Sequence, residues 1–516
     1  MMQIASRQAA GPGTIRGRDR WGFLSIVVVF GVLMAAGCAE ADPRSEEAPV
    51  PLEQMEAEPP QGAEVESAEE VEAESALSPL ENGEGLAGDG QISSTQGDDD
   101  VSGQLRPAFQ RPEHIRGIYL NAWLSGSRAR TDELIEMARR TEINTFVIDV
   151  KDATGYVSYS TQVELAREIG ADREIRIRDL PGLLTRLEAE GIYPIARIVV
   201  LKDHLLAEAR SDMAIQDSTG GTWVDGRGDV WVNPYDERVW AYHAELAREA
   251  VEMGFPEIQW DYIRFPDRPV SELAAAVFPG AEGRTRSQAI RGFLTWTGEE
   301  LADLEVPLTA DVFGVATSIR RDVGIGQVWE DFIDVVDAAL PMVYPSHYWE
   351  GSFGFQEPNA HPYEIVREAL EWGLRRSREV EGAGTIIPWL QDFTLGSPRY
   401  GIPEVRAQIL AAYDVGIQDW ILWNASGRYT EGAFEPAGGW PDGVEPPIRL
   451  GGRVVPAESR WEESEVAEVH DDSVAEGDSA SRGIKDESLG LREGDGQDGA
   501  DQGHDSQEDQ DHLHPH

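Results

Sequence analysis

Eight short apolar runs alternate with stretches of helical periodicity between residues 115 and 423, and this alternation constrains the fold more than any other feature. The runs are rich in β-branched and aromatic residues, as strands are. We expect strands at 115–123, 145–152, 193–200, 257–265, 307–313, 335–344, 385–390 and 417–423. We expect helices near 131–141, 179–190, 238–253, 285–303, 327–333, 361–378 and 403–413. Strands that alternate with helices in this way predict a closed parallel TIM (β/α)8 barrel rather than an open sheet.

Both flanks of this region have a different composition. Residues 39–104 and 457–516 are rich in Glu, Asp, Gly and Ser and poor in aromatic residues, so we expect a disordered acidic linker and a disordered acidic tail. The barrel domain is then 105–456. The whole chain has a formal net charge of −50, which argues against nucleic acid as a partner. We expect a monomer.

The first 38 residues have the order of a targeting segment. A stretch with several arginines precedes an apolar run at 21–36, about the length of a signal-peptide core. The run leads into Ala35-Ala-Gly-Cys38, which resembles a bacterial lipobox although Ala35 stands where Leu is usual. We therefore expect residues 1–38 to be a lipoprotein-type signal peptide, and Cys38 to anchor the protein to a membrane in the cell envelope, on the periplasmic or outer-surface side. An uncleaved anchor and free secretion are the alternatives.

In a barrel of this kind the carboxyl ends of the strands face one pocket. The residues at the expected strand ends combine carboxylates, amides, cations and aromatic rings: Asn121, Trp123, Asp149, Lys151, Asp152, Arg197, Lys202, Asp203, Asp261, Arg264, Asp311, Tyr344, Ser346, His347, Gln391, Asp392, Trp423 and Asn424. Aromatic faces pack on sugar rings, and carboxylates and amides bind sugar hydroxyls. This mixture predicts a carbohydrate pocket. The expected substrate-binding residues are Arg264, Lys151, Trp123, Tyr344, His347, Gln391, Trp423 and Asn424.

Cleavage of a glycosidic bond needs two carboxyl groups that flank the bond. Asp261 and Asp311 lie on the adjacent fourth and fifth strands. We expect Asp261 to act as nucleophile or transition-state stabiliser, held ionised by Arg264, and Asp311 to act as general acid. Alternatively, the Asp261–Arg264 pair closes the strand end structurally. Asp149 is a second candidate acid, unless it pairs with Lys151.

Five segments together resemble a bacterial family of glycosyl hydrolase domains over about 110–430. They are Ile115-Arg-Gly-Ile-Tyr-Leu120, Phe146-Val-Ile-Asp-Val-Lys-Asp152, Gln259-Trp-Asp-Tyr-Ile-Arg-Phe-Pro266, Ala310-Asp-Val-Phe-Gly314 and Met342-Val-Tyr-Pro-Ser-His347. That family is distantly similar to the alpha-amylase and alpha-galactosidase groups of barrels. The resemblance implies a catalytic Asp at the end of strand four, which is Asp261. The alpha-amylase group has a Glu acid on strand five, where this chain has Asp311.

The combined expectation is a membrane-tethered barrel glycoside hydrolase that cleaves O-glycosidic bonds of a polysaccharide or envelope glycan with two carboxylates. We expect no metal or other cofactor, because strand one reads Leu120-Asn-Ala-Trp123 and lacks the His-x-His of metal-dependent barrels. The alternative is a non-catalytic glycan-binding barrel. A phosphate-handling barrel is disfavoured, because no glycine-rich loop follows strand seven.

Overall fold

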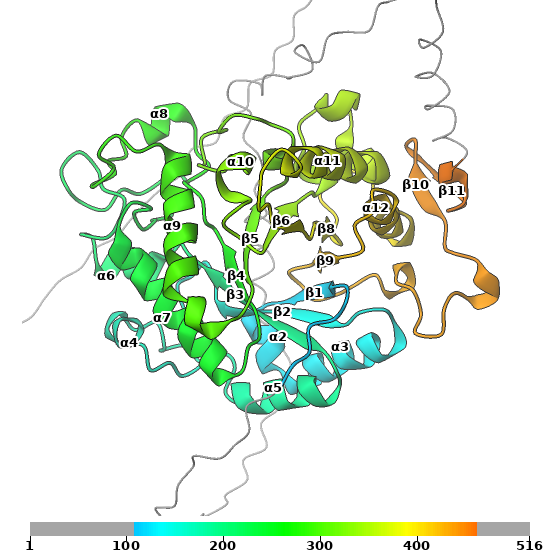
Figure 1. Cartoon of the computed structure of the whole chain (residues 1–516), viewed down its shortest axis with the longest axis horizontal. Helices are drawn as coiled ribbons and strands as arrows, with labels where there is room; N and C mark the ends of the chain where they lie inside the picture. The colour runs from blue at the N-terminus through cyan, green and yellow to red at the C-terminus, as the bar shows by residue number, and fades with distance from the viewer. Residues whose placement is uncertain (1–107, 462–516) are drawn as a thin grey trace, which may run out of the picture. The chain divides into compact units, whose positions relative to one another are not determined.

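The computed structural model describes residues 108–461, which form a closed parallel barrel with helices around it (Figure 1). The barrel strands are β1 (Arg116–Leu120), β2 (Thr145–Lys151), β3 (Tyr193–Val199), β4 (Ile258–Asp261), β5 (Leu308–Phe313), β6 (Ala338–Met342), β7 (Thr385–Ile386), β8 (Trp389–Gln391) and β9 (Trp420–Trp423). The strands pair in chain order, and β9 pairs in parallel with β1 to close the ring. The predicted TIM barrel is confirmed.

Two of the expected strands differ from the structure. The seventh is split into β7 and β8, which both pair with β6. Pro388 lies between them and has no N–H to donate to the ladder. The first strand ends at Leu120, because the side chain of Asn121 accepts a hydrogen bond from the backbone N–H of Leu124 and starts a helix. Trp123, which we expected at the end of the strand, is therefore helical.

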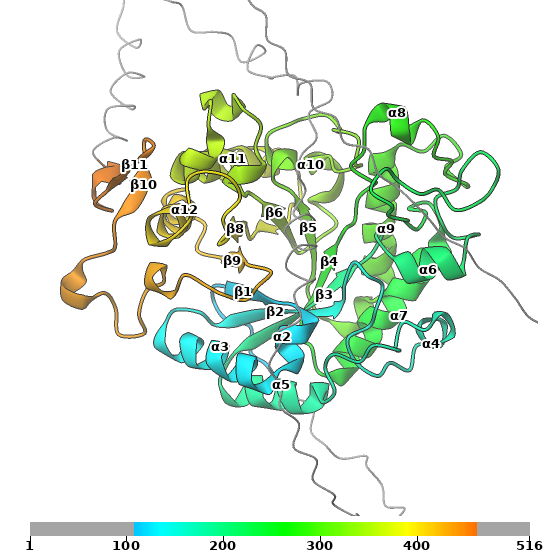
Figure 2. The same cartoon turned by 180° about the vertical axis from the view of Figure 1, so that it is seen from behind.

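The α-helices surround the barrel (Figures 1 and 2). They are α2 (Ala122–Gly126), α3 (Arg128–Arg140), α4 (Glu164–Ile169), α5 (Leu180–Ala189), α6 (His204–Ala209), α7 (Glu237–Met253), α8 (Val270–Leu273), α9 (Arg286–Glu300), α10 (Trp329–Phe332), α11 (Pro362–Ser377) and α12 (Ile402–Asp414). Side-chain caps fix several starts, as where Thr285 and Gln288 form a capping box on α9. All seven expected helices are present.

Short 3-10 helices complete the connections: η2 (Ala302–Leu304), η3 (Gly314–Thr317), η4 (Pro345–His347), η5 (Ser352–Gly354), η6 (Pro358–Ala360), η7 (Glu431–Ala433) and η8 (Pro441–Gly443). After the barrel closes, an antiparallel hairpin follows, formed by β10 (Ile448–Leu450) and β11 (Arg453–Val455). It lies beside α12 (Figure 1).

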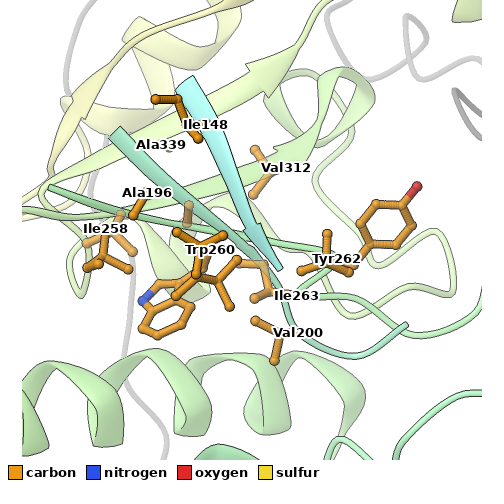
Figure 3. Close-up of a cluster of buried hydrophobic side chains, with 14 of the residues drawn as sticks. Ile148, Ala196, Val200, Ile258, Trp260, Tyr262, Ile263, Val312 and Ala339 are labelled. Atoms are coloured by element: carbon orange, nitrogen blue, oxygen red, sulfur yellow. The ribbon is translucent and has the colours of Figure 1, made fainter. Parts of the chain in front are cut away.

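Side chains alternate between the two faces of each strand, so they fill two buried layers, one inside the barrel and one between the strands and the helices. Trp260 of β4 points out of the barrel, toward the helices (Figure 3). Its ring packs edge-on against Phe293 of α9, with 5.3 Å between ring centroids. Its neighbours Gln259 and Asp261 point the other way, into the barrel. A separate cluster of buried apolar residues fills the interior: Ile115, Tyr119, Val147, Tyr193, Ile195, Ala338, Leu340, Tyr344, Ile387, Trp389, Ile421 and Trp423. The outer layer stabilises the fold, and the inner layer supports the polar residues at the strand ends.

Several expectations concern residues outside 108–461. The signal peptide, the acidic linker, Cys38 and nearly all of the acidic tail lie there. The described chain extends past residue 456, where Ala457 is buried and Arg460 pairs with Asp414 at 3.0 Å. Among residues 108–461, no helix has both the length and the apolar character needed to cross a membrane.

Candidate active site

Asp261 is the last residue of β4 and is held by two neighbours. Its Oδ2 accepts a hydrogen bond from Nε of Arg197 at 2.8 Å, and a second one from the Nη2 group. Its Oδ1 accepts from the backbone N–H of Tyr262 at 2.5 Å. We expected the guanidinium on Asp261 to be that of Arg264, but Arg197 of the neighbouring strand β3 occupies that place.

Arg197 links the carboxylates of three strands. Its Nη1 donates to Oδ1 of Asp149 at 2.6 Å, and its Nε lies 3.9 Å from Oδ2 of Asp311. Arg197 and all three aspartates are buried, with at most 5% of each residue exposed. A buried guanidinium is stable only when charged partners surround it, so these four residues form one electrostatic unit.

Asp311 lies inside the barrel on β5. Its Oδ1 accepts a hydrogen bond from Nε1 of Trp389 at 2.7 Å. Burial raises the pKa of Asp311 well above its usual range, and the negative charge of Asp261 raises it further. The Nε atom of Arg197 lies 2.8 Å from Oδ2 of Asp261 and 3.9 Å from Oδ2 of Asp311. These two oxygens are therefore at most about 6.7 Å apart. Two carboxyl groups, one of them with a raised pKa, therefore lie close together inside the barrel.

Asp149, the other candidate acid, is held on both sides. Its Oδ1 pairs with Arg197, and its Oδ2 accepts a hydrogen bond from the hydroxyl of Tyr119 at 2.5 Å. Burial raises the pKa of Asp149 to about 6, against the opposing effect of Arg197. Asp149 therefore does not pair with Lys151.

An aromatic wall borders this cluster. The rings of Tyr119 and Trp423 stack with 4.0 Å between centroids and 17° between planes. The guanidinium of Arg197 lies 5.3 Å from the first ring centroid and 5.1 Å from the second. The indole Nε1 of Trp423 is buried and has no hydrogen-bond acceptor among the described residues. Buried donors are normally satisfied, so this unpartnered N–H is unusual for a buried indole.

Lys151 does not join the cluster. Residue pairing between β2 and β3 shifts after Asp149, where one extra residue on β2 forms a bulge, so that Lys151 pairs with Ile198 on the outer face. The ammonium of Lys151 contacts Asp203 at 3.0 Å and the carbonyl oxygen of Val199 at 2.7 Å, with no part of the side chain exposed. Its contacts are those of a buried structural ion pair.

Arg264 lies in a second group of aromatic and cationic side chains, just beyond Asp261. Its guanidinium lies 4.9 Å from the ring centroid of Tyr262, 5.1 Å from that of Trp231 and 4.8 Å from that of Phe313. The ammonium of Lys202 lies 5.9 Å from the first two centroids. Trp231 and Lys202 belong to the long connection between β3 and β4.

The remaining predicted substrate-binding residues differ in where they lie and in how their polar groups are used. Tyr344 and His347 lie just beyond β6, with ring centroids 5.3 Å apart, and burial lowers the pKa of His347 to about 4. Gln391 uses its side-chain amide within the protein, accepting from Ser346 and donating to the carbonyl oxygen of Phe393.

Two further predicted residues lie at the ends of the first and last barrel strands. Asn424 donates to the carbonyl oxygens of Asp392 and Arg428 and fixes the turn after β9. Trp123 lies on α2 and is 60% exposed.

Three residues of the cluster had no predicted role: we expected Arg197 at a strand end facing the pocket without assigning it a function, and we did not predict Tyr119 or Trp389 there. Tyr119, Arg197 and Trp389 supply, respectively, the hydrogen bond to Asp149, the shared guanidinium and the donor to Asp311. Strand alternation carries a signal for two of them, because Tyr119 and Arg197 occupy inward positions in apolar strands. Among residues 108–461, no three His, Cys, Asp or Glu side chains are grouped so that they could hold a metal ion.

A parallel barrel with carboxyl groups at the carboxyl ends of its strands is an architecture that glycoside hydrolases use. The chain belongs to the family described as "Putative glycosyl hydrolase domain", whose match spans residues 117–429, more than half of the chain. A comparison with curated proteins finds no match.

Solved structures with a similar fold come from several bacteria. A hypothetical protein from Ruminiclostridium thermocellum ATCC 27405 is 37% identical, over 38% of this chain and 97% of that chain, with a TM-score of 0.35. The PgaB (BpsB) glycoside hydrolase domain from Bordetella bronchiseptica is 11% identical, over 61% and 95% of the two chains, with a TM-score of 0.44. The alpha-galactosidase TtGalA from Thermus thermophilus is 16% identical, over 68% of each chain, with a TM-score of 0.38.

Proposed function

We propose that this protein hydrolyses O-glycosidic bonds of a polysaccharide or envelope glycan, with Asp261 and Asp311 as the two reacting carboxyl groups. One observation carries the proposal: the two groups face each other on adjacent strands around Arg197, and burial with the charge of Asp261 raises the pKa of Asp311. A raised pKa keeps Asp311 protonated and able to donate.

In the proposed reaction, Asp311 donates its proton to the glycosidic oxygen as the bond from that oxygen to the anomeric carbon breaks. The carboxylate of Asp261 attacks the anomeric carbon and forms a glycosyl ester. Water, deprotonated by Asp311, then hydrolyses the ester. Retaining enzymes have their carboxyl groups about 5–5.5 Å apart, and inverting enzymes about 6.5–9.5 Å apart. The anomer that is released first, identified by proton NMR of the product, distinguishes the two outcomes.

Two other features support a sugar as the substrate. The Tyr119 and Trp423 rings beside the carboxylates are of the kind that packs on sugar rings, and the buried indole N–H of Trp423 has no acceptor among the described residues. The expected lipid anchor at Cys38 would place the enzyme in the cell envelope, near envelope glycans. Location and substrate are thus parts of the proposal.

The test is a screen of the purified protein against neutral and charged glycans, with reducing-end release as readout. Asp261→Asn should abolish release while binding persists, because the substitution removes transition-state stabilisation. Asp303→Asn is the matched control, since Asp303 pairs with Arg248 outside the barrel. Glycan binding without release by the unmodified protein would instead identify a non-catalytic glycan-binding barrel.

A further inference from the structure

Trp123 stands out as an exposed aromatic side chain at the rim of the barrel. It is 60% exposed, whereas Trp389 and Trp423 inside the barrel are buried. It lies on α2, which begins two residues after the carboxyl end of β1. Tyr119 of the active-site cluster is four residues earlier, so the chain cannot place the two Cα atoms more than about 14 Å apart. The backbone of Trp123 therefore lies near that of the active-site cluster.

The Trp123 side chain packs against a cation. The guanidinium of Arg176 lies 5.4 Å from its ring centroid and also 5.4 Å from the ring centroid of Tyr156. The Arg176 side chain is 4% exposed and is fixed by ion pairs with Asp152 and Glu174. Two aromatic rings thus share one buried, immobilised cation.

Gly126 shows that this arrangement depends on direct backbone contact. A Cβ atom at Gly126 would come within 1.8 Å of the backbone oxygen of Arg176. That oxygen belongs to the main chain and cannot rotate away. The last residue of α2 must therefore be glycine for the helix to rest on the Arg176 segment, and this contact fixes the position of Trp123.

We propose that Trp123 and Tyr156 form an outer subsite that binds a sugar ring of an extended, uncharged glycan chain. This inference rests on the proposed function and deepens it, because a subsite outside the carboxylate cluster is of use only to a substrate of several sugars. Pre-organised aromatic rings bind pyranose faces at low entropic cost. Two carboxylates, Asp152 and Glu174, outnumber the single cation Arg176 beside the rings, which disfavours an acidic glycan.

The test is electrophoresis in native gels that contain amylose, xylan, galactan or, as the acidic probe, polygalacturonate. All variants carry Asp261→Asn, so that the polysaccharide is not consumed. At least one neutral polysaccharide should retard the parent. Trp123→Ala should weaken that retardation about tenfold in apparent Kd, equivalent to about 1.4 kcal/mol. Gly126→Ala should weaken it too. Trp461→Ala is the matched control, because Trp461 is 53% exposed and also stacks with an arginine, Arg460.

Unchanged retardation of the Trp123→Ala variant, retardation by polygalacturonate alone, or no retardation by any polysaccharide would each overturn the subsite. Thermal unfolding of each variant shows that the barrel is intact, and Trp123→Ala serves as the exposed substitution if Gly126→Ala fails to fold. The two proposals can fail separately. Retardation without hydrolysis by the unmodified protein would retain the subsite and reject the enzyme, whereas hydrolysis without any effect of Trp123→Ala would do the reverse.

Discussion

The backbone N–H of Tyr262 donates a hydrogen bond to Oδ1 of Asp261, and Tyr262 has a φ of 50° in this position. A bulky residue in the left-handed region is strained, typically by about 1–3 kcal/mol. Such strain persists only where the surrounding structure enforces it. Here the strained backbone of Tyr262 directs its N–H group at the carboxylate of Asp261, which we propose as nucleophile. The hydrogen bond restricts the orientation of that carboxylate.

Replacement of Tyr262 by Val should destabilise the protein more than replacement by Asn, by about 1 kcal/mol. Both variants lose the ring, but Asn tolerates the left-handed region whereas a β-branched residue does not. Urea denaturation of the two variants measures the difference. Equal stability would mean that the backbone of Tyr262 is not strained.

Replacement of Arg197 by Met should destabilise the protein by about 3–5 kcal/mol near neutral pH, because it leaves buried carboxylates without their shared cation. The loss should be smaller near pH 5, where the aspartates can bind protons instead. Denaturation at the two pH values checks this. Arg248→Met, which removes an exposed cation paired with Asp303, should change stability little at either pH. A pH-independent loss in Arg197→Met would contradict the electrostatic account.

Asp311→Asn should slow the hydrolysis of substrates with poor leaving groups far more than that of aryl glycosides with good leaving groups, by about 100-fold or more. Only a poor leaving group needs a proton from Asp311. The measurement is kcat/KM over a series of leaving groups. If all substrates slow down equally, Asp311 is not the acid, and Asp149 becomes the leading candidate.

The contribution of Asp149 and Asp392 to protein stability should fall as the pH rises from about 4 to about 7. Burial raises the pKa of Asp149 to about 6 and that of Asp392 to about 7, from an ordinary value of 3.8. Both carboxyls bind a proton more readily in the folded than in the unfolded chain, so their contribution is full below the unfolded pKa and is lost as pH rises through the folded one. Asp392→Asn should flatten the upper part of this profile in thermal unfolding. A profile that keeps its slope would rule out this assignment.

Cys38→Ser should abolish incorporation of a fatty-acid probe and release the protein from membranes. Cys38 is the only cysteine of the chain, so no other thiol can take the lipid. Metabolic labelling followed by membrane fractionation measures both effects. Labelling that persists in the variant would exclude lipidation at this residue.

The barrel could be predicted from the sequence because each strand carries a local signal. β-branched runs such as 193–200 and the helical periods between them need no knowledge of partners. The same applies to Asp261 and Asp311, which lie at strand positions where polar residues are costly. These residues do lie together, although their catalytic role stays a prediction.

The contacts between side chains could not be predicted, because they depend on the register of neighbouring strands. Arg197 reaches Asp261 from an adjacent strand, whereas Arg264, three residues away in sequence, appeared the natural partner. Lys151 faces outward because of a bulge that no local pattern reveals. Asn121 ends the first strand through a side-chain cap, a signal that we read as a pocket residue.

The pairing of β9 with β1 sets the order in which the chain can fold. The backbone N–H of Ile115 bonds to the side chain of Asp419, 304 residues further along. A ribosome that adds roughly 5–20 residues per second leaves the free edge of β1 without its partner for tens of seconds. The unpaired N–H and C=O groups of an exposed strand edge can form hydrogen bonds with strands of other chains, which leads to aggregation. Chaperones that cover the β1 edge during synthesis should therefore affect the yield of folded protein more than any that act after residue 423 has emerged.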